Sequence, residues 1–86
     1  MDDDQIRDRI EALEAEEQKL RAQEADAAET GHDDVIAADA KRLAEIRIQL
    51  DQLWDLLRQR KAKRNAGEDP DTATLRDQGT VEDYLG

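Results

Sequence analysis

The side chains best suited to chemistry form a cationic run in the second half of the chain. This run consists of Arg58, Arg60, Lys61, Lys63 and Arg64. Five cations within seven residues are a pattern that grips phosphate groups, so nucleic-acid contact is one hypothesis. Two observations argue against it. The whole chain has a net charge of −10, and the antiparallel pairing described below brings Asp2, Asp3 and Asp4 beside the run. Cations at a helix C-terminus also complement the helix dipole. We therefore favour a structural role for the run and keep nucleic-acid binding as the alternative.

Two short spacings resemble metal sites, and both lack essential parts. Glu29 and His32 have the Glu-x-x-His spacing of carboxylate di-metal bundles, but Gly31 interrupts the helix between them. Asp69 and Asp71 begin like a calcium loop without its later ligands and its glycine. The chain has no cysteine, which excludes disulfides and thiolate metal sites. The sequence predicts no metal ion and no cofactor.

General acid–base catalysis needs carboxylates or a histidine that converge in a pocket. In the first helix, Glu17 and Glu24 are carboxylates at positions that would otherwise be apolar. Such residues more often fix the register or the oligomeric state of paired helices. A pair of helices offers no evident pocket, so the sequence predicts a protein that is not an enzyme.

Two heptad-like seams must position all of these residues. Successive positions of the first seam are separated alternately by four and three residues. The pattern stops near Gly31 and resumes in the second seam. The first seam is Ile6, Ile10, Leu13, Glu17, Leu20, Glu24 and Ala27, and the second is Ile36, Asp39, Leu43, Ile46, Leu50, Leu53 and Leu57. This spacing predicts an all-α, coiled-coil-like antiparallel hairpin over residues 1–65. Its helices are expected at about 3–29 and 34–65, joined by a turn at 30–33.

The expected register places residues opposite each other when their numbers add to about 63. It pairs Ile6 with Leu57, Ile10 with Leu53, Leu13 with Leu50, and Leu20 with Leu43. The same register places Glu24 opposite Asp39. We therefore expect tight packing at the open end of the hairpin and loose packing near the turn.

An acidic tail is expected over residues 66–86, because Gly67 and Pro70 end the second helix. A capping-box pattern at residues 80–83 predicts a short helical turn at 81–85. The tail either docks on the hairpin or stays unfolded until a partner arrives, and the sequence leaves both open. The acidic start and the absence of a long apolar run indicate a soluble, cytoplasmic protein without a membrane segment.

A widened apolar face surrounds Trp54 in the second helix, since Trp54 and Leu56 flank the seam. This widening predicts a second contact, either with another copy of the chain or with the tail. Fourteen large apolar side chains between Ile6 and Leu57 make a thin core, and oligomerisation is the usual remedy in such small scaffolds. We expect a homodimer that forms a four-helix bundle, with a further protein partner as a possibility. The interface candidates are Leu50, Leu53, Trp54, Leu56, Leu57, Tyr84 and Leu85.

The segments 50–60, 66–71 and 81–85 carry a family resemblance. Their sequences are Leu-Asp-Gln-Leu-Trp-Asp-Leu-Leu-Arg-Gln-Arg, Ala-Gly-Glu-Asp-Pro-Asp and Val-Glu-Asp-Tyr-Leu. Together they resemble the small actinobacterial proteins grouped as domain of unknown function 2630. The resemblance implies a helical hairpin in an intracellular bacterial protein and implies no activity. The function expected from the sequence is thus a non-enzymatic helical interaction protein. It would self-associate and bind a protein partner, or alternatively act as a nucleic-acid accessory protein.

Overall fold

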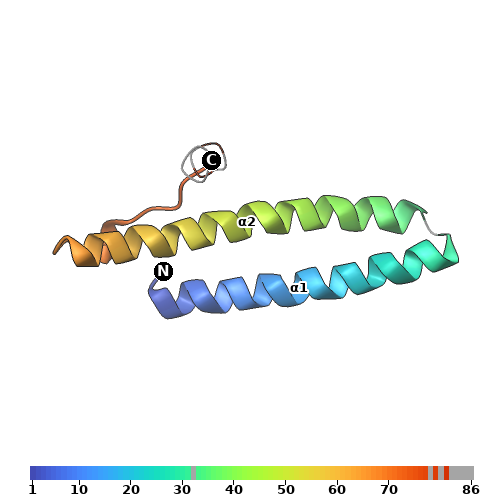
Figure 1. Ribbon diagram of the computed structural model, residues 1–86, viewed down its shortest axis with the longest axis horizontal. Helices are drawn as coiled ribbons and strands as arrows, with labels where there is room; N and C mark the ends of the chain where they lie inside the picture. Colours follow the sequence, from blue (N-terminus) through green and yellow to red (C-terminus); the bar gives the residue numbers. More distant parts are fainter. Residues whose placement is uncertain (32, 78, 80, 82–86) are drawn as a thin grey trace.

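Two long antiparallel helices lie side by side and are joined by a tight turn (Figure 1). This computed structural model describes residues 1–31, 33–77, 79 and 81. Helix α1 spans Asp3–Thr30, helix α2 spans Asp33–Asn65, and a short 3-10 helix, η1, spans Pro70–Thr72. No strand occurs among the described residues. The predicted all-α fold with two helices is therefore confirmed.

The two ends of α1 are set by local hydrogen bonds. The Asp2 carboxylate accepts a bond from the Gln5 backbone N–H at 2.8 Å, and the Gln5 side chain accepts from the Asp2 N–H at 2.9 Å. This reciprocal capping box satisfies two backbone donors that the helix itself leaves unpaired. At the other end Gly31 has φ 78°, and its N–H donates to the Ala27 carbonyl. A left-handed residue of this kind ends the helix and begins the turn.

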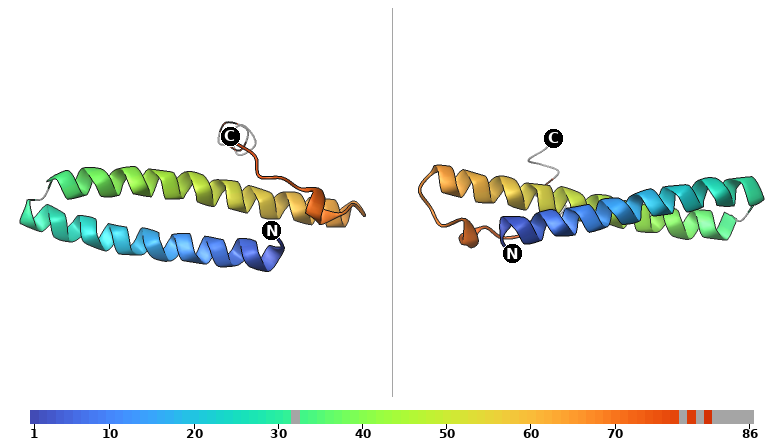
Figure 2. Two further views of the ribbon diagram at one scale, coloured as in Figure 1. Left: turned by 180° about the vertical axis from the view of Figure 1, so that it is seen from behind. Right: turned by 90° about the horizontal axis from the view of Figure 1, so that it is seen from below.

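Helix α2 ends in a second glycine-dependent cap. Gly67 has φ 75°, and the N–H groups of Gly67 and Glu68 donate to the carbonyls of Arg64 and Lys63 at 3.1 and 2.8 Å. This pattern is a Schellman motif, in which glycine reverses the chain direction at low conformational cost. Pro70 then opens η1, and the chain turns back along α2 (Figure 2).

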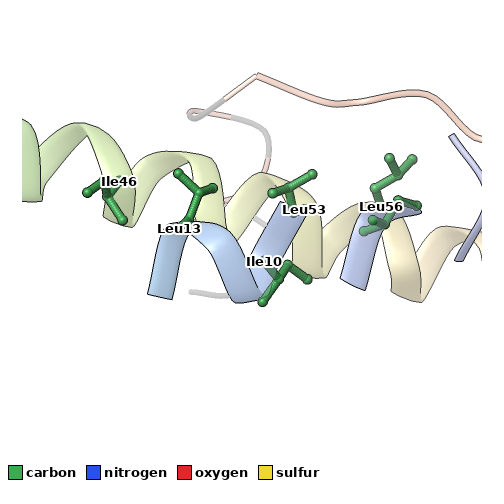
Figure 3. Packing of buried hydrophobic residues seen from close by; sticks show 6 residues of the cluster. Ile10, Leu13, Ile46, Leu53 and Leu56 are labelled. Atoms are coloured by element: carbon green, nitrogen blue, oxygen red, sulfur yellow. The ribbon is translucent and has the colours of Figure 1, made fainter. Parts of the chain in front are cut away.

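The hydrophobic core occupies the open half of the hairpin. Its buried members are Ile6, Ile10 and Leu13 of α1 with Ile46, Leu53 and Leu56 of α2. Figure 3 shows five of these labelled side chains gathered where the two helices meet. Half-buried Leu20, Leu50, Leu57 and Ala73 pack around them. Ala73 belongs to the tail, so the tail already contributes to the core.

The half of the hairpin near the turn is packed more sparsely. Ala27 is its buried apolar residue on α1, whereas Leu20, Ile36 and Leu43 are half-buried. Asp39 is only 9% exposed, and its Oδ2 atom has no hydrogen-bond partner. A buried carboxylate oxygen without a partner lowers the stability of the folded state.

Replacing this carboxylate should stabilise the protein. We expect Asp39→Leu to raise the free energy of unfolding by about 1 kcal/mol, because it removes a buried unpaired oxygen and adds apolar contact. Urea denaturation at one fixed protein concentration would measure the change. Asp51→Leu, on an exposed position of the same helix, is the matched control for the higher helix propensity of leucine. An equal gain in the two variants would contradict the prediction.

Polar pairs across the hairpin agree with the antiparallel arrangement. Arg42 of α2 forms a bidentate ion pair with Glu16 of α1, in which Nη2 lies 2.9 Å from Oε1. This hydrogen-bonded guanidinium holds the pKa of Glu16 below its ordinary value. The two side chains are 34% and 38% exposed. Because water screens such a pair, it orients the helices more than it stabilises them.

Candidate functional site

Trp54 lies on an open face of the hairpin. Its side chain belongs to α2, and the residue is 47% exposed, whereas its neighbours Leu53 and Leu56 are buried. Shallow hollows flank Trp54 on both sides, and residues of both helices line them. We call this surface the Trp54 face. Tryptophan is enriched at protein–protein interfaces, so this face is a candidate binding surface.

The two hollows of the Trp54 face differ in charge. The first is lined by Asp3, Arg7, Trp54, Leu57, Arg58, Lys61 and Arg64. The second is lined by Arg7, Ile10, Glu11, Glu14 and Trp54. The first therefore carries an excess of cations, and the second carries more acidic than basic side chains. Both have apolar floors, supplied by Leu57 and Ile10 together with the indole.

Most side chains of the predicted cationic run form ion pairs within the chain. Arg60 is 6% exposed, and its guanidinium bonds to Asp3 of α1, to Asp71 at 2.9 Å and to the Pro70 carbonyl at 3.2 Å. Arg64 also pairs with Asp3 at 2.8 Å. Further contacts join Lys63 to Glu68 and Arg58 to Asp55, each with its closest N–O distance between 3.7 and 3.8 Å. Of the five cations, Lys61 is the exposed one with no ion pair to any described residue.

Arg60 and Asp3 also shift each other's titration. Hydrogen bonds from Arg60 and Arg64 hold the pKa of Asp3 below its ordinary value, although partial burial works in the opposite direction. The bonds to Asp3 and Asp71 raise the pKa of Arg60. This three-way contact fastens the start of α1, the end of α2 and the tail to one another. Sequence periodicity offered a signal for it, because Arg60 and Arg64 continue the second seam by steps of three and four.

The tail docks on a stripe of α2 that apolar periodicity did not reveal. The Arg76 guanidinium forms a bidentate ion pair with Asp55, in which Nε lies 2.8 Å from Oδ2. Gln59 donates to the Thr74 carbonyl at 2.8 Å, and Gln52 donates to the Arg76 carbonyl at 3.2 Å. Asp55 is fully buried by these contacts. We call the residues Gln52, Asp55, Leu56 and Gln59 the tail stripe.

The tail stripe has a spacing that sequence reasoning could have used. Its members recur at steps of three and four, so they share one side of α2, but three of them are polar. The tail also contains a single cation, Arg76, which is a natural partner for a buried acid. The pairing joins residues 21 positions apart, so neither residue indicates it alone.

The structure divides the predicted interface candidates into two groups. Leu53 and Leu56 are buried within the chain, and half-buried Leu50 and Leu57 pack against the core. The tail, including Ala73, covers the Leu56 side of the widened face, which is one of the two contacts predicted for that face. Trp54 remains open. Tyr84 and Leu85, the predicted helical turn at 81–85 apart from Val81, and His32 lie outside the described residues.

The described part of the tail lies on the tail stripe and does not line either hollow of the Trp54 face. Val81 is 1% exposed, so this apolar residue of the tail is buried. Its N–H donates to the Asp77 carbonyl at 3.1 Å. The tail, whose conformation the sequence left open, is thus docked over its described length.

The described part of the chain contains neither a group of metal-ligating side chains nor a helix able to span a membrane. There, no three histidine, cysteine, aspartate or glutamate residues are grouped so that they could hold a metal ion. Neither helix in that part combines the length and the apolar character that crossing a bilayer requires.

Comparison with known proteins gives a family and no activity. Residues 2–86 match the family described as "Protein of unknown function (DUF2630)". Similar proteins include the uncharacterized protein Rv0898c of Mycobacterium tuberculosis and the uncharacterized protein Mb0922c of Mycobacterium bovis. Each is 44% identical over 78 residues, which cover 90% of this chain and 83% of the relative. No solved structure matches. The resemblance seen in the segments around Trp54, Pro70 and Tyr84 is confirmed, and the chain belongs to the DUF2630 family of proteins of unknown function.

Proposed function

We propose that this protein is a non-enzymatic interaction module that binds protein through the Trp54 face and associates with itself there, giving a four-helix bundle. The half-exposed indole between two hollows carries the proposal. Aromatic side chains in such positions are typical anchors of protein interfaces, because they bury a large area at a small loss of side-chain freedom.

The surroundings of Trp54 support binding more than catalysis. Both hollows are open, and the carboxyl groups that line them are either exposed, as in Glu11 and Glu14, or paired with arginine, as in Asp3. General acid–base chemistry needs groups placed within hydrogen-bond reach of one reacting atom. Nucleic-acid binding through residues 58–64 receives less support, because ion pairs engage Arg58, Arg60, Lys63 and Arg64 within the chain.

The first test removes the indole. We expect Trp54→Ala to weaken self-association at least about tenfold, because truncation of a central aromatic anchor commonly costs more than about 1.4 kcal/mol. Sedimentation equilibrium at micromolar concentration would measure the dissociation constant. Trp54 is the single tryptophan, so its fluorescence emission should also shift to shorter wavelength as the wild-type chain is concentrated.

Leu75→Ala is the matched control, because Leu75 is 56% exposed and lines neither hollow of the Trp54 face. It should leave the dissociation constant unchanged. A wild-type chain that stays monomeric, with emission independent of concentration, would contradict the proposed function. So would an association that Trp54→Ala leaves intact.

A further inference from the structure

The charges of the Trp54 face are arranged in opposite directions from the indole. Lys61 lies two helical turns beyond Trp54, toward the open end of the hairpin, in the hollow that also contains Asp3. Glu11 and Glu14 lie in the other hollow. Because α1 runs antiparallel to α2, their higher numbers on α1 place them toward the turn. The face is therefore cationic on one side of Trp54 and acidic on the other.

A surface of this kind is complementary to itself. A two-fold interface brings the same patch of two copies together, so residue i of one copy meets residue j of the other, and the reverse contact forms as well. With the axis beside Trp54 and the hairpins running in opposite directions, each cationic hollow faces the other copy's acidic hollow. A parallel arrangement would instead place cationic hollow against cationic hollow, which is unfavourable.

Resting on the proposed function, we infer that the occupant of the Trp54 face is a second copy of this chain in an antiparallel two-fold arrangement. The two indoles lie near the axis, and Lys61 of each copy faces Glu14 of the other.

The charges that take part are available for such a contact. Lys61, Glu11 and Glu14 are exposed, and none of them forms an ion pair with another described residue. An acidic peptide would complement the cationic hollow alone, and a basic peptide would complement the acidic hollow alone. A second copy satisfies both hollows at once, and this favours it over other partners.

Reciprocal charge reversal tests the arrangement in the full-length chain. Lys61→Glu and Glu14→Lys should each weaken self-association at least about tenfold, because each places like charges together twice across the axis. A one-to-one mixture of the two variants should recover association to within a few-fold of wild type. In the mixed dimer every contact again joins opposite charges. Sedimentation equilibrium would give the three dissociation constants, and a tag on one variant would identify the mixed dimer.

Controls separate this contact from net charge and from folding. Lys41→Glu and Glu29→Lys make the same charge changes on exposed positions that line neither hollow, and they should have little effect. Circular dichroism should show wild-type helix content in all variants. If Trp54→Ala weakens the dimer but the mixture gains nothing over either variant, the inferred arrangement is overturned and the proposed function stands. If Trp54→Ala has no effect, both are overturned.

Discussion

Arg76→Ala should lower the free energy of unfolding by about 3 kcal/mol, as expected when one partner of a buried ion pair is removed. Asp55 is fully buried, and Arg76 is its bidentate partner, so the substitution leaves a carboxylate out of water with reduced compensation. Urea denaturation at fixed protein concentration would measure the loss. Arg47→Ala, on an exposed position of α2 without an ion pair in the described chain, is the control and should change little.

The double variant Asp55→Leu with Arg76→Leu distinguishes an ion pair from a merely crowded site. Replacing both partners by apolar residues removes the buried charge as well as its compensation. We expect the double variant to be more stable than Arg76→Ala. If the loss of unfolding free energy in the double variant equals the sum of the losses caused by Asp55→Leu alone and Arg76→Leu alone, the two sites are independent. That result would contradict the coupling we assign to this pair.

The same pair predicts the direction of the pH dependence. Hydrogen bonds from Arg76, aided by Gln59, hold the pKa of Asp55 below its ordinary value, although burial opposes them. A carboxyl group with a lowered pKa in the folded state adds stability above its unfolded pKa of about 3.9. That stability is lost as the pH falls from there through the folded pKa. Wild type should therefore lose more unfolding free energy below about pH 4 than Arg76→Ala does. A steeper acid loss in the variant would contradict this.

Leu13→Ala should have a comparable effect, lowering the free energy of unfolding by about 3 kcal/mol. Leu13 is 1% exposed in the middle of the core, and the two-helix packing leaves few neighbours that could close the cavity. The same denaturation experiment would measure it. Leu75→Ala removes the same atoms from a 56% exposed position, so its loss should stay near 0.5 kcal/mol. Equal losses in the two variants would mean that Leu13 is not a core residue in solution.

Heptad spacing was sufficient to predict the helices, because burial of Ile6, Ile10 and Leu13 against α2 follows directly from one apolar stripe on each helix. Gly31 and Gly67 likewise indicated where the helices end, because glycine readily takes the left-handed conformation that closes a helix. These are local signals that involve a few neighbouring residues.

The docking of the tail could not be predicted in this way. It depends on Asp55 and Arg76, two charged residues that a hydrophobic pattern assigns to solvent. It also depends on a hydrogen bond that Gln59 donates to the backbone carbonyl of residue 74, and any residue at that position would supply this acceptor. For the same reason apolar spacing places Leu56 and Trp54 on one widened face, although the tail covers Leu56 and leaves Trp54 open. Trp54 is thus open because the tail lies on the tail stripe, on another side of α2.

Because the chain is synthesised from its N-terminus, the tail stripe is made before the tail that covers it. Helices α1 and α2 can pair as soon as residues 1–65 have emerged, but Asp55 and Leu56 then still face water. Arg60 likewise has Asp3 at that stage, and lacks Asp71 and the Pro70 carbonyl. Residues that emerge after α2 therefore complete the contacts at the open end of the hairpin. During synthesis the chain therefore passes through a stage in which both helices have formed but the tail contacts at the open end have not.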